Sequence, residues 1–316
     1  MINKYLKNGY ITLMPSFSEE DIKILKTEII SLFDNEEQKI LSVIDIKNKN
    51  EKIFKKIIRV INSPENQNFI EKLNKFYNKK ISLLPNFHIM KNYHVNRLET
   101  HRIGWHRDCA DEFNYEYSAN KLSNENYVFG KIGIFFQNNS ENYGGAVDVI
   151  PGSHLYIKKR SKFLKILNSL RLYLLILLHK NFINIYKIFP ESFYTFFLSA
   201  KKIKAKIGSS VIFDSRIQHR GSPINEKYAH ETKQLDDHHI SVPKQFTKIS
   251  IYCHFGSVDG ADAYMYGRMK RKEESYKNYF NGWVNEAEEY KNYDKSLYDS
   301  MMSIIGPLKD KYKNNL

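Results

Sequence analysis

Residues 208–223 read GSSVIFDSRIQHRGSP, a β-rich run followed by a histidine, His219, and a turn that contains Gly, Ser and Pro. Short runs rich in Val, Ile, Phe and Tyr that end at turn residues are typical of β-strands. Runs of the same kind lie at 87–90, 127–136, 146–150 and 249–252. Several short strands separated in this way predict an all-β core, either a barrel or a jelly roll.

Helices are expected before and after this core in the sequence. The whole chain, residues 1–316, is expected to form a single domain. A short strand is predicted at 10–13, and Ser18 is placed to cap the helix that follows it. The predicted class is therefore mainly β with flanking helices. Its expected parts, in order, are a strand and Lys-rich amphipathic helices at 1–82, the strands of the core at 83–255, and a polar, aromatic-rich helical tail at 256–316.

The apolar segment 155–200 interrupts the expected strands and is predicted to be a helical insertion. Its apolar residues lie on more than one helical face, but Arg171, His179 and Lys180 interrupt them, so a membrane-spanning helix of about 20 apolar residues is not expected. The insertion would pack on the core or form a homodimer interface. The alternatives are a pocket wall for a lipid-like substrate, or peripheral membrane contact through its basic residues.

The composition indicates which kinds of binding partner and which cellular compartment to expect. The net charge is +14, but lysine is spread from Lys4 to Lys313 beside abundant Asn, Ile and Tyr, which favours a compositional bias over a nucleic-acid-binding surface. The two cysteines, Cys109 and Cys253, form no CxxC pair, which argues against a disulfide framework and a structural zinc site. The N-terminal residues lack the long apolar stretch of a signal peptide. We therefore expect a cytoplasmic protein, with peripheral membrane association as the alternative.

The tetrapeptide WHRD at 105–108 places His106 and Asp108 two residues apart. If this segment is a strand, both side chains face the same side and can bind one ion, while Trp105 faces the other. His219 is the natural third ligand. Two histidines and one carboxylate on one face of an octahedron leave positions open for other ligands, which is the arrangement of non-haem iron(II) oxygenases.

Four segments together resemble, in order and character, the motifs of phytanoyl-CoA dioxygenase-like proteins. They are GYITL at 9–13 with the helix after it, WHRD at 105–108, GGAVDVIPGSH at 144–154, and the stretch 208–223. The resemblance extends from the N-terminus to about Phe255, without the insertion. It implies a double-stranded β-helix, that is, a jelly-roll or cupin-like core.

The resemblance also implies an iron(II)- and 2-oxoglutarate-dependent dioxygenase in which His106, Asp108 and His219 bind the metal. Such enzymes use 2-oxoglutarate and dioxygen as cosubstrates, usually hydroxylate small molecules or lipids, and release succinate and carbon dioxide. An aspartate at position 108 favours hydroxylation over halogenation, because halogenating relatives leave the carboxylate position to a halide.

Members of this family usually bind the distal carboxylate of 2-oxoglutarate with an arginine, six residues before a Cys-His-Phe-like strand end. In TKISIYCHF, residues 247–255, that position is Lys248. Lysine can neutralise a carboxylate as a point charge, but it cannot form the bidentate contact of arginine. Lys248 is therefore the first candidate for 2-oxoglutarate binding, with Arg220 and Lys131 as alternatives.

Two other functions stay open. A nucleic-acid demethylase of the same superfamily would suit the basic charge, but the sequence has neither the asparagine-rich strand before the HxD pair nor the paired arginines after the distal histidine that mark such proteins. A non-catalytic β-barrel binding or scaffold protein would explain Lys248 in place of arginine and the large insertion. A complete set of metal ligands argues against that second alternative.

Four other histidines are expected to be structural or solvated and not to bind the metal. His154 lies in a Pro-Gly-Ser-His turn, where a histidine is usually structural. His230, His238 and His239 lie in the long loop after His219, where we expect them to be solvated.

Overall fold

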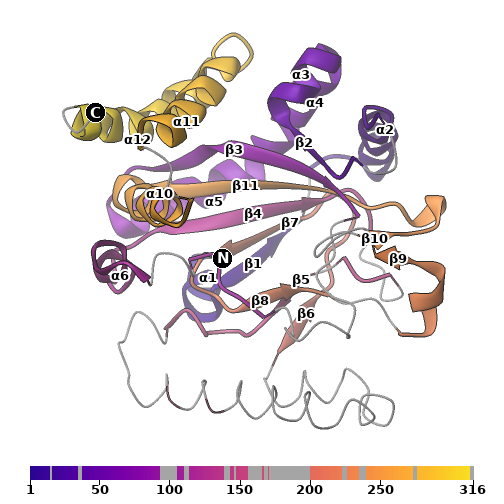
Figure 1. The fold of residues 1–316 in the computed structure, drawn as a ribbon, viewed down its shortest axis with the longest axis horizontal. Coiled ribbons are helices and arrows are strands. Elements are labelled where there is room, and N and C mark those ends of the chain that lie inside the picture. Colours follow the sequence, from indigo (N-terminus) through magenta and orange to yellow (C-terminus); the bar gives the residue numbers. More distant parts are fainter. Residues whose placement is uncertain are drawn as a thin grey trace.

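The computed structural model describes residues 1–14, 16–34, 38–92, 105–109, 114–138, 143–145, 147–155, 166, 170, 200–222, 226–234, 240–272 and 276–313. Helices form a large part of this chain, so its class is mixed helix and antiparallel sheet and not mainly β (Figure 1). The predicted insertion at 155–200 lies outside the described residues, except for 155, 166, 170 and 200. Its packing, dimer and membrane expectations therefore stay predictions.

The larger sheet has six strands in the order β1-β7-β4-β11-β3-β2, and every neighbouring pair is antiparallel. The strands expected at 10–13 and 249–252, and the run after Gly208, all lie in it. In sheet order the strands are β1 (Tyr10–Leu13), β7 (Ser210–Asp214), β4 (Phe129–Phe135), β11 (Ile249–Ser257), β3 (Ile81–Lys91) and β2 (Ile40–Ser42).

A second, three-stranded sheet lies against one face of the first (Figure 1). Its strands, in sheet order, are β6 (Lys201–Ile203), β5 (Val147–Val149) and β8 (His219–Gly221). An apolar cluster with members from both sheets includes Phe135 and Phe213 of the large sheet and Val149 of the small one. The two antiparallel sheets therefore enclose a core of their own.

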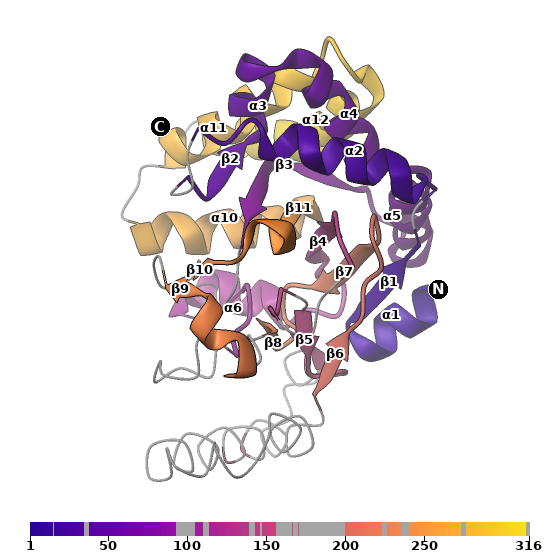
Figure 2. The ribbon, with the colours of Figure 1, turned by 90° about the vertical axis from the view of Figure 1, so that its right-hand side faces the viewer.

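Most of the helices cover the other face of the large sheet (Figure 2). Side chains alternate along a strand, and in β7 Val211 and Phe213 belong to the core between the sheets while Ile212 belongs to the core under the helices. The helices are α1 (Ile2–Asn8), α2 (Glu19–Ile30), α3 (Val43–Lys49), α4 (Glu51–Ile61), α5 (Pro64–Tyr77), α6 (Glu116–Leu122), α10 (Val258–Lys272), α11 (Tyr276–Tyr290) and α12 (Lys295–Lys313).

Local sequence explains where these helices begin. The hydroxyl of Ser18 accepts a hydrogen bond from the backbone N–H of Asp21, which confirms the predicted cap of α2. Ser63 caps α5 in the same way, and Pro64 occupies the first turn, where its missing N–H has no cost. Helices α5, α11 and α12 then pack on β3.

The long connection from β8 to β11 contains short elements among the residues that the structure describes. They are two 3-10 helices at Glu226–Glu231 and Lys244–Phe246, and a two-stranded ribbon of β9 (Lys233–Gln234) and β10 (Ile240–Ser241). None of the helices in the described ranges is both long enough and apolar enough to cross a membrane.

Candidate metal centre

His106 and His219 are brought together by their own backbones. The N–H of each residue donates to the carbonyl of the other at 2.9 Å, which forms an isolated antiparallel bridge beside β8. Their imidazole rings then lie side by side, with centroids 4.4 Å apart and planes tilted by 53°. Two segments more than a hundred residues apart in sequence thus present two nitrogen ligands at one point.

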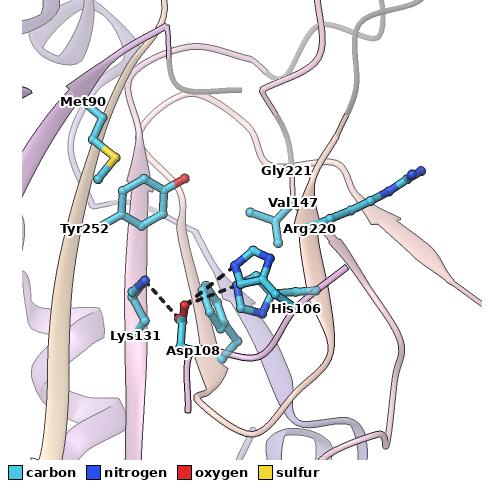
Figure 3. A pocket seen from close by; sticks show the side chains of 10 residues that line it. Met90, His106, Asp108, Lys131, Val147, Arg220, Gly221 and Tyr252 are labelled. Atoms are coloured by element: carbon cyan, nitrogen blue, oxygen red, sulfur yellow. Dashed lines mark ion pairs between the residues drawn. The ribbon is translucent and has the colours of Figure 1, made fainter. Parts of the chain in front are cut away.

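Asp108 completes the group. Its Oδ1 is 3.9 Å from Nε2 of His106 and 3.7 Å from Nε2 of His219, and one ligand atom from each of the three residues lies within 4.8 Å of the others (Figure 3). These distances are too long for hydrogen bonds. Donors at right angles around a metal with bonds of about 2.1 Å would be about 3 Å apart. The three side chains therefore fit one metal ion after inward shifts of less than about 1 Å.

The expected strand at 105–108 is not formed. His106 makes the isolated bridge, but Asp108 lies in a turn, where the next residue, Cys109, donates its N–H to the carbonyl of Ser215 at 3.3 Å. The side chains of His106 and Asp108 therefore meet at the start of a turn and not along a regular strand. Cys109 is fully buried and is not among the described residues grouped as metal ligands.

The protonation states suit metal binding. Burial of Asp108 would raise its pKa, but the Lys131 ammonium, 3.0 Å from Oδ2, and the two imidazoles hold that pKa well below its usual range. Burial lowers the pKa of His219 to about 3, so its ring is neutral at neutral pH. Nδ1 of this neutral ring can donate to the Ile217 carbonyl at 3.2 Å, which leaves the Nε2 lone pair for an ion.

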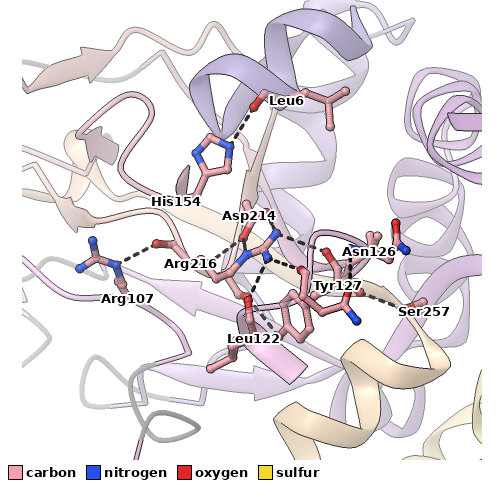
Figure 4. A network of polar contacts seen from close by, with 12 residues as sticks. Leu6, Arg107, Leu122, Asn126, Tyr127, His154, Asp214, Arg216 and Ser257 are labelled. Atoms are coloured by element: carbon pink, nitrogen blue, oxygen red, sulfur yellow. Dashed lines mark hydrogen bonds and ion pairs between the residues drawn. The ribbon is translucent and has the colours of Figure 1, made fainter. Parts of the chain in front are cut away.

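A buried arginine, Arg216, holds the turn that precedes His219 (Figure 4). Arg216 is 0% exposed and donates to both carboxylate oxygens of Asp214, at 2.8 and 2.6 Å, and to the carbonyls of Leu122 and Tyr127, both at 3.2 Å. Its own carbonyl accepts from Nε of Arg107 at 2.9 Å. The turn after β7 is thereby fixed to the segment that contains His106. Sequence reasoning missed this network, although Asp-Ser-Arg directly after a buried strand was its visible sign.

A cavity of about 70 Å³ opens beside the three ligands and lies between the two sheets. Its lining beyond His106, Asp108 and His219 consists of Met90, Lys131, Val147, Phe213, Arg220, Gly221 and Tyr252. Met90, Val147, Phe213 and Tyr252 were not predicted to line a site. The alternation of side chains along a predicted strand indicates which face of the sheet each residue lies on. It does not indicate which of those residues lie beside the cavity.

The candidates for 2-oxoglutarate binding differ in position. Lys131 and Arg220 line the cavity, whereas Lys248 is not part of its described lining. Lys248 is buried, and its ammonium donates to the carbonyl of Gly144. Burial, together with the nearby positive charges of Lys202 and Lys26, lowers the pKa of Lys248 to about 7.

Arg220 has partners on the far side of its strand. Its Nε is 3.0 Å from Oδ2 of Asp148, and its guanidinium carbon lies 4.9 Å from the ring centroid of Trp105. In Figure 3 the Arg220 side chain points away from the three ligands. Lys131 is thus the candidate whose ammonium faces the ligand group directly.

The structure also describes two of the other histidines considered in the sequence, His154 and His230. His154 is buried, and its Nε2 lies 2.9 Å from the carbonyl of Leu6 (Figure 4). Its ring packs on Gly9, where a Cβ would be 2.5 Å from Nδ1 and where φ is +79°, so only glycine fits. His230 is exposed, while His238 and His239 lie outside the described residues.

No family model matches the chain, and no curated protein matches it either. The resemblance to phytanoyl-CoA dioxygenase-like proteins therefore stays a prediction. Among solved structures, the chain is similar to EctD from S. alaskensis with bound Fe, at 13% identity and a TM-score of 0.45, over 82% of this chain and 76% of that one.

Two further structures are similar at the same level. EvdO2 from Micromonospora carbonacea var. aurantiaca, complexed with 2-oxoglutarate, has 14% identity and a TM-score of 0.42 over 81% of this chain and 89% of that one. SnoN, a non-heme alpha ketoglutarate dependent epimerase from nogalamycin biosynthesis, has 11% identity and a TM-score of 0.43 over 80% of each chain. Similarity at this level does not identify the activity of this chain.

Proposed function

We propose that this protein is an iron(II)- and 2-oxoglutarate-dependent oxygenase that hydroxylates a small-molecule or lipid-like substrate. The observation that carries the proposal is the convergence of His106, Asp108 and His219 at one end of a cavity between two antiparallel sheets. Two opposed sheets with the metal ligands at one end are consistent with the double-stranded β-helix that the sequence motifs imply.

The donor set favours iron(II) over other metals. Two imidazole nitrogens and one carboxylate oxygen form a facial set with open positions. Among the described residues, no cysteine belongs to this group of candidate ligands. Iron(II) bound here, with 2-oxoglutarate and dioxygen, would supply the oxidation of a substrate C–H bond with release of succinate and carbon dioxide. The protein positions the ligands and the cosubstrate and excludes water.

Lys131 is the residue that we propose for the distal carboxylate of 2-oxoglutarate, in preference to Lys248 and Arg220. The ammonium of Lys131 reaches the cavity, whereas Arg220 pairs with Asp148 and Lys248 donates to Gly144. In the structure the ammonium of Lys131 lies 3.0 Å from Oδ2 of Asp108. With a divalent ion held by Asp108, this ammonium would be available to pair with the distal carboxylate of 2-oxoglutarate.

The walls of the cavity support the same reaction. Val147 and Phe213 are almost fully buried and give the cavity apolar sides next to the ligands. The Phe213 ring lies 4.7 Å from the ring of His219, centroid to centroid, and holds that imidazole in place. Such walls exclude bulk water from the bound cosubstrate, which limits unproductive side reactions.

Anaerobic titration tests this function. Iron(II) and 2-oxoglutarate should produce the metal-to-ligand charge-transfer band of a chelated oxoacid in the wild-type protein and in His230→Ala, whose histidine is exposed. His219→Ala should show no band. Succinate release, measured with candidate metabolites and lipids under air, then identifies the substrate. Failure of the wild-type protein to give the band would favour the non-catalytic binding protein instead.

A further inference from the structure

Lys248 lies near two other lysines that come from distant parts of the fold. Lys248 directly precedes β11, whereas Lys202 belongs to β6 of the small sheet and Lys26 to α2. In the ranges that the structure describes, none of the three forms an ion pair with a carboxylate. Asp148, which pairs in register with Lys202, bonds instead to Arg220. The three lysines therefore gather positive charge without a described anion to balance it.

The side chain of Lys248 is buried and its backbone is fixed. The residue is 5% exposed, its N–H donates to Oδ1 of Asn92 at 2.8 Å, and its carbonyl accepts from the Asn92 N–H at 2.9 Å. Nζ donates to the carbonyl of Gly144, and no second acceptor for it lies among the described residues. An ammonium has three N–H donors, so the charged form would leave two of them buried without a described acceptor. The neutral amine suits this position better.

Burial and the neighbouring charges make the amine of Lys248 reactive. Burial first, and then the charges of Lys202 and Lys26, lower its pKa from 10.5 to about 7. At pH 7 about half of this side chain is then neutral, against roughly one in three thousand for a lysine of ordinary pKa. Only the neutral amine is a nucleophile, and burial or a second cation nearby is how proteins activate a lysine. A small uncharged electrophile is the reagent that suits such a buried amine.

We propose that Lys248 is a carbamylation site, at which dissolved carbon dioxide adds to Nζ and the new carboxylate lies towards Lys202 and Lys26. The nitrogen lone pair forms the N–C bond, one C=O π pair moves to oxygen, and one proton leaves to water. Nothing is oxidised or reduced. The N–H that remains on the carbamate nitrogen keeps the hydrogen bond to the Gly144 carbonyl. Carbon dioxide is the only reactant, so the modification does not depend on the oxygenase reaction proposed above, which would release the same gas.

The carbamate balances the charge of this group. Lys202 and Lys26 each gain an opposite charge in place of a like one, and opposite charges attract more strongly in partly buried surroundings than in water. The anion would connect β11 with β6 of the other sheet and with α2 on the helical side. A bound inorganic anion would also balance the charge, so the experiment has to detect the covalent bond itself.

Carbon-13 NMR of the wild-type protein tests the proposal. Equilibrated with labelled bicarbonate at about pH 8, the protein should show a carbamate resonance apart from those of bicarbonate and carbon dioxide. Alkylation with a trialkyloxonium salt and mass spectrometry of the peptides should then locate the carbamate at Lys248, and not only at the α-amino group of Met1, which also titrates near this pH. Lys248→Arg should lose the Lys248 carbamate. Lys244→Arg, which changes an exposed lysine of the same connection, should keep it.

Lys202→Met keeps the reacting amine and gives a second test. Loss of one cation beside the carbamate should raise the carbon dioxide concentration for half modification about tenfold. Lys201→Met, exposed on the same strand, should leave that concentration unchanged. A wild-type protein without a carbamate at Lys248 at saturating carbon dioxide, or an unchanged half-modification concentration in Lys202→Met, would overturn the proposal. Neither measurement uses iron or 2-oxoglutarate, so either outcome leaves the proposed function standing.

Discussion

Arg216 offers a sharp test of how the metal centre is held. Arg216→Met keeps an unbranched side chain but removes the guanidinium, which is fully buried and bonded to both oxygens of Asp214. The Asp214 carboxylate then stays buried and loses both guanidinium contacts, although the backbone N–H of residue 216 still donates to its Oδ1. Breaking a buried ion pair on one side usually costs about 3–5 kcal/mol. The carbonyls of Leu122 and Tyr127 also lose a donor, so we expect a loss near the upper end of this range.

Urea unfolding of the metal-free protein measures this loss, in a cycle with Asp214→Asn and the double variant. Because each single change leaves one buried partner behind, the double variant should lose less than the sum of the two, with a coupling of about 1–3 kcal/mol. Lys295→Met is the control, since Lys295 and Asp299 form an exposed pair at 2.9 Å whose loss should cost less than about 1 kcal/mol. Strict additivity, or an Arg216→Met loss no larger than the control, would refute this reading of the network.

Three other predictions concern the lysines and a buried carboxyl. Lys131→Met should weaken 2-oxoglutarate binding at least tenfold while Lys248→Met leaves it unchanged, as read from titrations of the iron(II)-loaded proteins. Burial lowers the pKa of Lys248 from its ordinary value to about 7, so the unfolded chain binds the extra proton between about pH 7 and 10.5. The free energy of unfolding of the wild type, measured with urea, should therefore rise across that pH interval relative to that of Lys248→Met. The same pH dependence in both proteins would contradict this prediction. Glu286→Ala removes the carboxylate that accepts from the N–H of Phe87 at 2.9 Å, and should cost about 1–3 kcal/mol in the same assay, whereas a neutral result would mean that the N–H finds another acceptor.

The three candidate metal ligands could be predicted from the sequence because each has a local sign. His106 and Asp108 form a recognisable HxD pair, and His219 follows a buried β-run and precedes a turn. The structure brings all three together, although Asp108 lies in a turn and not in a strand. The predicted strands of β1, β7 and β11 are confirmed for the same reason, since alternation and turn residues act within a few positions.

The preference for Lys131 over Lys248 that we propose could not be derived from the sequence in this way. Counting along the chain selected Lys248, but the position of a lysine relative to the cavity depends on the register of β4 between β7 and β11. That register places Lys131 beside Asp108, whereas the ammonium of Lys248 donates to the carbonyl of Gly144.

The hydrogen bonds of Arg216 could not be predicted for a related reason. Its acceptors at Leu122 and Tyr127 lie about ninety residues away in sequence.

Anaerobic titration of the wild-type protein with iron(II) and then 2-oxoglutarate tests the central claim most directly. We predict one iron(II) per chain and a charge-transfer band that appears only when both are present, with the band lost in His219→Ala and retained in His230→Ala. Iron(II) binding that is unchanged in His219→Ala, or a wild-type protein that gives no band, would contradict the assignment of His106, Asp108 and His219 as an oxygenase metal centre.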